Sequence, residues 1–113
     1  MDDSEQWLAR LRHDLVKRLV WPARDRRDLG GPVARGELVA TVIDDQGSPI
    51  AAALLWAKLR GHAPASVPER ALDTFGAVIS VAVTAAAADD IAGVLALEPA
   101  FEQLARLVKS QGV

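Results

Sequence analysis

Apolar residues at helical spacing, interrupted at intervals by proline and glycine, most constrain what this chain can fold into. The first segment carries four leucines that recur every three or four residues and so lie on one stripe of a helix: Leu8, Leu11, Leu15 and Leu19. Proline lacks an N–H and clashes with the turn before it, so Pro22 predicts a kink or a restart of this helix at Trp21. Gly30 and Gly31 predict its end.

Proline, glycine and helix-capping residues also mark the helix ends in the rest of the chain. Ser48 before Pro49 predicts a helix start, and Gly61 predicts the end of that helix. Ser66 and Glu69 have the spacing of a capping box, which predicts a long helix over 66–88. This helix is the least polar and is expected to be central.

A last helical pattern follows, for which Asp89 or Asp90 is the expected cap and in which Pro99 predicts a kink or a new start. Two stretches, 36–45 and 76–84, are rich in β-branched residues and are compatible with strands as well. Helix is preferred for 36–45 because no partner strand is evident. The cap before 76–84 and the alanines after it favour helix there.

These patterns predict an all-α protein: a compact bundle of four to five mostly antiparallel helices with a Pro-kinked first helix. With 113 residues, the chain is expected to form a single helical domain over 1–113. A hydrophobic content of 50% argues against disorder. The longest uncharged run, 74–88, has 15 residues, fewer than the roughly 20 that a membrane span needs, so no membrane partner is expected.

Charge and cysteine content narrow the function. The net charge of −2 argues against nucleic-acid binding. The absence of cysteine excludes disulfides, zinc–thiolate sites and thiol nucleophiles. The acidic N-terminus does not have the pattern of a signal peptide, which predicts a cytoplasmic protein. No nucleotide-binding, hydrolase or metalloprotease motif is present, so no catalytic residue, metal ligand or cofactor is predicted, and a non-enzymatic role is favoured.

The candidate site is the polar face of the first helix. At about 100° per residue, His13 falls opposite the leucine stripe. Arg10, Lys17 and Arg24 follow one another at heptad spacing on the same outer face, with Val20 and Trp21 beside them. Residues 1–35 carry a net charge of +2 and the remainder −4. This face is predicted to be an ordinary solvated surface or a docking surface for a protein partner, such as an acidic one. Exposed tryptophan with arginine is a common composition of binding hot spots.

The three tryptophans add a prediction of self-association. Trp7 is expected to be buried beside the leucine stripe, whereas Trp21 and Trp56 are the candidates for an exposed apolar patch. The alternative for Trp21 is that the kink at Pro22 folds it into the core. An exposed patch predicts a homodimer.

A second functional hypothesis comes from residues 13–19. His13, Asp14, Leu15 and Leu19 match the H-box of sensor histidine kinases, which this stretch resembles. Val16 stands where that pattern has a basic residue, and Arg18 where it has proline. The resemblance implies a signalling domain that carries a phosphoryl group on His13.

Overall fold

The computed structural model describes residues 3–38, 40–41 and 49–111, and within this part of the chain all regular structure is helical. The first helical stretch comprises α1 (Asp3–Leu15), the π-helical turn η1 (Val16–Val20) and α2 (Trp21–Leu29). It is followed by α4 (Pro49–Gly61), α5 (Glu69–Ala87), the short α6 (Ile91–Leu95) and α7 (Leu97–Gln111).

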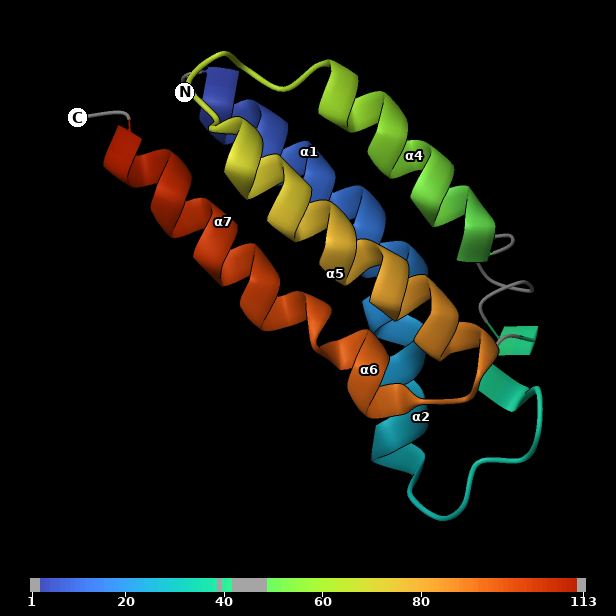
Figure 1. Ribbon diagram of the computed structural model, residues 1–113. Helices are drawn as coiled ribbons and strands as arrows, with labels where there is room; N and C mark the ends of the chain where they lie inside the picture. Colours follow the sequence, from blue (N-terminus) through green and yellow to red (C-terminus); the bar gives the residue numbers. More distant parts are fainter. Residues whose placement is uncertain (1–2, 39, 42–48, 112–113) are drawn as a thin grey trace.

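The long helices form an up-down-up-down bundle. In Figure 1, α4 runs antiparallel to α1, α5 antiparallel to α4, and α7 antiparallel to α5, and the start of α1 lies at the same end of the bundle as the end of α7. Helix α5 packs between α4 and α7, while α1 contacts α4 and α7 on the other side. The predicted all-α bundle with antiparallel neighbours is therefore confirmed, and its central helix is α5 (Glu69–Ala87), within the predicted 66–88 segment.

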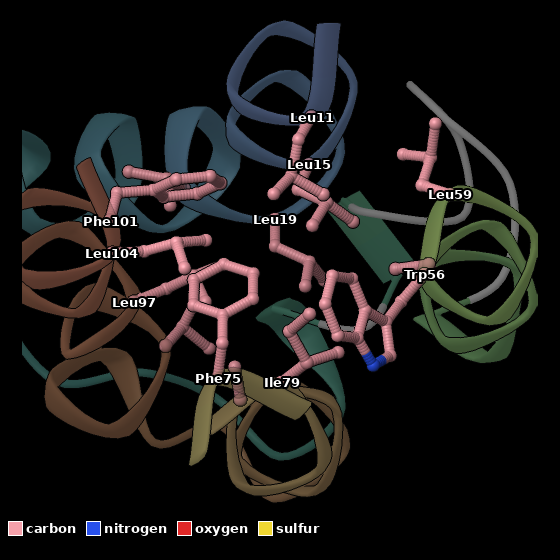
Figure 2. Close-up of a cluster of buried hydrophobic side chains, with 14 of the residues drawn as sticks. Leu11, Leu15, Leu19, Trp56, Leu59, Phe75, Ile79, Leu97, Phe101 and Leu104 are labelled. Carbon is pink, nitrogen blue, oxygen red and sulfur yellow. The ribbon is translucent and has the colours of Figure 1, made fainter. Parts of the chain in front are cut away.

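The core is a column of leucines and aromatic rings. The ring centroid of Trp56 lies 5.2 Å from that of Phe75, and the ring centroid of Phe75 lies 4.9 Å from that of Phe101. Aromatic contacts therefore join α4, α5 and α7. Leu11, Leu15 and Leu19 close the core from the first helix (Figure 2). No polar side chain is buried among the described residues, so apolar burial and packing hold the bundle together.

Proline and glycine act at the element ends largely as predicted. Helix α2 begins at Trp21 with Pro22 in its first turn, and Gly30 ends it with a positive φ of 72°. Asp90 caps α6 through a hydrogen bond from the Gly93 N–H to its carboxylate. Pro99 lies in the first turn of α7, so a new helix starts there. The structure describes Gly61 as the last residue of α4, but Ser48 lies outside the described residues.

The predicted capping box at Ser66 is wrong. Helix α5 begins at Glu69, after Pro68 in extended geometry, and no side chain caps it. The Ser66 hydroxyl instead lies 2.6 Å from the hydroxyl of Ser4 and so joins the start of α1 to the loop before α5. Proline at 68 explains the change, because its ring disfavours helical geometry at the residue before it.

Two segments were open between helix and strand. Residues 76–84 lie within α5 and are helical. In the segment 36–45, residues 37–38 and 40–41 are helical, whereas 39 and 42–45 lie outside the described residues. Within the described part, helix is the outcome at both places.

A carboxylate from another element holds the 36–38 segment in place. Asp89, in the turn after α5, accepts hydrogen bonds from the backbone N–H groups of Gly36 at 2.7 Å and Leu38 at 3.1 Å. Among the described residues it is the one non-glycine with a positive φ, 59°. The Leu38 side chain beside this contact is fully buried. The two hydrogen bonds therefore fasten the chain after α2 to the turn between α5 and α6.

The junction of α4 and α5 is tied by one arginine. Arg60 donates to the carboxylate of Asp73 at 2.5 Å and to that of Glu69 at 3.4 Å. The hydrogen bond to Asp73 is the main reason why the pKa of Arg60 is raised above its ordinary value. Glu69 and Asp73 are thus both engaged by Arg60.

By length and composition alone, α5 is the one helix in the described part of the chain that is long and apolar enough to cross a membrane. The central helix of a bundle meets the same criteria. Here α5 packs against α4, α6 and α7, and the residues on its inner face are buried, including Phe75, Ile79 and Ala82.

Candidate functional site

Part of the predicted surface on the first helix is exposed as expected. The side chains of Arg10, His13 and Lys17 are exposed, and Trp21 retains 48% of its surface accessible. His13, Lys17 and Trp21 follow one another at intervals of four residues, which places them on one side of a helix. These four residues are called the outer face below.

Val20 is not part of the outer face, and its prediction as an exposed neighbour of Trp21 is wrong. Its side chain is fully buried. The cause is the π turn η1, in which the Trp21 N–H donates to the carbonyl of Val16, five residues earlier. In such a turn residue i+5 returns to the face of residue i, so Val20 lies on the same face as the buried Leu15.

Arg24 also leaves the predicted row. It forms an ion pair with Glu98 at the start of α7 and is only partly exposed. The extra residue in η1 shifts the heptad register, so Arg24 no longer continues the line from Arg10 and Lys17. Arg10 itself lies 3.9 Å from Asp14, measured from its Nε to the carboxylate oxygen.

The tryptophans divide differently from the prediction. Trp7 is buried, as expected, and its indole N–H donates to the carbonyl of Leu59 at 2.8 Å. Trp56 is buried at 7% exposure, so its proposed place in an exposed patch is wrong. Its ring packs against Gly76 of α5, where the absence of a side chain makes room for it. Trp21 is therefore the exposed tryptophan, and the alternative that the Pro22 break folds it into the core is wrong.

The outer face carries one histidine, His13. His13 has no described residue within hydrogen-bonding or ion-pair distance, and the second histidine, His62, is exposed as well. Among the described residues no three histidine or carboxylate side chains gather as a metal site. What these exposed groups offer is a cationic surface with one large aromatic side chain.

A second feature was missed by the sequence analysis: an apolar groove between α5 and α7. It has a volume of about 450 Å³ and is lined by the side chains of both helices. Val78 and Leu107 fit the helical spacing of the apolar residues around them. Val78 is only partly buried, and Leu107 is 44% exposed. The small Ala71 and Ala100 beside them are the sequence signal that the packing stays incomplete here.

The fold and these surfaces define a small helical bundle with two exposed features, a cationic face that carries Trp21 and an apolar groove. Compared with protein-family models, with curated proteins and with solved structures, the chain gives no match. Its function is therefore argued from its own geometry.

Proposed function

We propose that the protein is a non-enzymatic interaction or adaptor module that contacts a protein partner through the outer face of its first helix. The observation that carries this proposal is the exposure of Trp21, whose side chain is 48% accessible although the chain buries its other two tryptophans. Tryptophan and arginine are the residue types most enriched at binding hot spots. Contact of the apolar indole with water raises the free energy of the isolated protein, and a partner that covers the indole would remove this contribution.

The charges around Trp21 indicate the chemistry of the partner. Arg10 and Lys17 are exposed cations on the same side of the helix, and among the described residues only Arg10 lies within ion-pair distance of a carboxylate, that of Asp14. Complementary potentials increase association rates and select partners. The proposed partner is therefore a protein with an acidic surface, and a second copy of this chain is included because its residues 36–113 carry a net charge of −4. The absence of cysteine fits a cytoplasmic setting.

Site-specific photo-cross-linking in the native cell tests this proposal. A photoreactive residue at Lys17 on the outer face should give a discrete adduct that disappears when Trp21→Ala is introduced. The same probe at Thr84, which is exposed on α5, is the matched control. Adducts of equal yield at both positions, or an adduct that survives Trp21→Ala, would contradict the proposal.

A second candidate function is phosphotransfer through His13. The observation that favours it is that the imidazole of His13 is exposed on a helical bundle, with no described side chain competing for its ring nitrogens. An exposed imidazole can accept a phosphoryl group from a phosphorylated receiver domain or from acetyl phosphate. His13→Gln should then abolish acid-labile labelling, whereas His62→Gln should leave it intact. Labelling that is absent from the wild type, or equal in both variants, would exclude this function.

A further inference from the structure

The groove between α5 and α7 has the dimensions of a small-molecule site. Its volume of about 450 Å³ lies within the range of about 300–1,000 Å³ that is usual for ligand pockets. Phe75 and Leu104 are almost fully buried and form its bottom, while Val78 and Leu107 line it with partly accessible surface. The groove is therefore an apolar hollow that extends from the core to the surface.

Arg70 is the one charged side chain that lines this groove. The carboxylates nearest to it in the sequence are Glu69 and Asp73, and both are engaged by Arg60. Among the described residues, Arg70 has no ion-pair partner of its own. An apolar groove with an unpaired guanidinium at its edge complements a molecule that has an apolar body and an anionic head.

The two ends of the groove are lined by different residues. Arg70 lies in the first turn of α5, and Val78 lies eight residues further along, about 12 Å away at the rise of an α-helix. From α7, Leu107 lines it near the end of that helix and Ala100 near its start. Because the helices are antiparallel, the cation and Leu107 lie towards one end of the groove and Val78 and Ala100 towards the other. A linear ligand therefore has one orientation in which its head meets Arg70.

We propose that the α5–α7 groove binds a free fatty acid of medium chain length, with its carboxylate at Arg70 and its alkyl chain over Phe75 and Leu104 towards Val78. The site is separate from the outer face of the first helix, so it does not depend on the interaction proposed above. Arg70 provides the anion preference, and Gln103 and Thr74 are the other polar side chains in the groove.

Calorimetric titration with decanoate, below its micelle concentration, tests the site on the full chain. Decanoate should bind, and Arg70→Gln should weaken its binding at least tenfold while binding of decanol stays unchanged. Arg106→Gln is the matched control, because Arg106 is an exposed arginine of α7 that does not line the groove. Each methylene group added between octanoate and decanoate should tighten binding about fourfold, as expected for its burial.

Methyl NMR locates the bound chain. The methyl signals of Val78 and Leu107 should shift on addition of decanoate, whereas those of the exposed Leu54 on α4 should not. Leu107→Asp places a carboxylate in the groove at an exposed position, so it should fold normally and prevent decanoate from binding. Three results would each overturn the proposal: decanoate does not bind, Arg70→Gln binds it with the affinity of the wild type, or the shifts are centred on Leu54. Capture of an acidic helical peptide by the groove in place of the fatty acid would also overturn it. Trp21→Ala should leave the titration unchanged, which separates this test from that of the interaction surface.

Discussion

Leu15 and His13 lie two residues apart on α1 but have opposite environments. Leu15 is fully buried in the core, whereas His13 is exposed. Leu15→Ala should lower the free energy of unfolding by about 2–5 kcal/mol, because it removes buried methyl groups and leaves a cavity. His13→Ala should change it by less than about 0.5 kcal/mol, as is usual for a surface substitution. Urea unfolding measures both, and equal losses would contradict the assignment of the two faces.

Asp89 stabilises the fold through its carboxylate and its backbone. Asp89→Asn tolerates the positive φ but leaves one oxygen to accept the two N–H groups of Gly36 and Leu38. This change should cost about 1 kcal/mol, and Asp89→Ala should cost about 2–3 kcal/mol because it loses both hydrogen bonds and adds backbone strain. Denaturant melts give the two values. The reverse order, or no loss for Asp89→Ala, would show that this contact does not hold the 36–38 segment.

Gly93 and Gly61 are a matched pair of helical glycines. A Cβ atom at Gly93 would lie 2.6 Å from the Cβ of Ala85 and 2.7 Å from a carboxylate oxygen of Asp90, whereas at Gly61 it would meet nothing within 4 Å. Gly93→Ala should therefore destabilise the protein by about 1–3 kcal/mol through overpacking. Gly61→Ala should be neutral or slightly stabilising, because alanine favours helix more than glycine does. Thermal melts that rank the two variants the other way would show that α6 has room to move.

At the scale of elements, the sequence predicts the helices and most of their ends, because proline, glycine and helix-spaced leucines act locally. The same local patterns correctly place the helix over 76–84 despite its β-branched residues. Ser66 shows the limit of this reasoning: its spacing to Glu69 suits a cap, but Pro68 and the contact with Ser4 decide its role. A contact with a residue 62 positions away in the sequence cannot be seen in a local pattern.

The candidate site was predictable only up to the π turn. Arg10, His13 and Lys17 are exposed as their spacing predicts, but a regular helical period assigns the buried Val20 to the exposed side. The spacing of the apolar residues fits a regular helix as well as a helix with one extra residue in a turn, so it does not reveal the π turn. The groove between α5 and α7 was missed for a related reason, because periodicity shows which face of a helix is apolar but not whether its neighbour covers that face.

The π turn itself is testable as a consequence of Pro22. In a regular helix the ring of Pro22 would clash with the carbonyl of Arg18, and the wider turn before Trp21 avoids this. Deletion of Lys17 should restore a regular turn and bring the clash back. In that deletion background Pro22→Ala should raise stability by about 3 kcal/mol, whereas in the full chain it should change stability by about 1 kcal/mol or less. Equal effects in both backgrounds, measured as a double-mutant cycle by urea unfolding, would show that Pro22 is not the cause of η1.

At the scale of the whole molecule, the exposed Trp21 predicts self-association of the bundle. Burying the Trp21 indole against the acidic part of a second copy would remove apolar surface from water at a site with no other described cover. We expect a dimer at micromolar concentration in sedimentation velocity. Tryptophan truncations at hot spots cost about 2 kcal/mol or more, so Trp21→Ala should raise the dissociation constant about 30-fold or more without loss of helical circular dichroism. Trp56→Ala should behave differently, because Trp56 is a core residue, and should unfold the chain at lower urea concentration. A wild type that sediments as a monomer up to about a millimolar, where only very weak association would escape detection, would leave a different protein as the partner of the outer face.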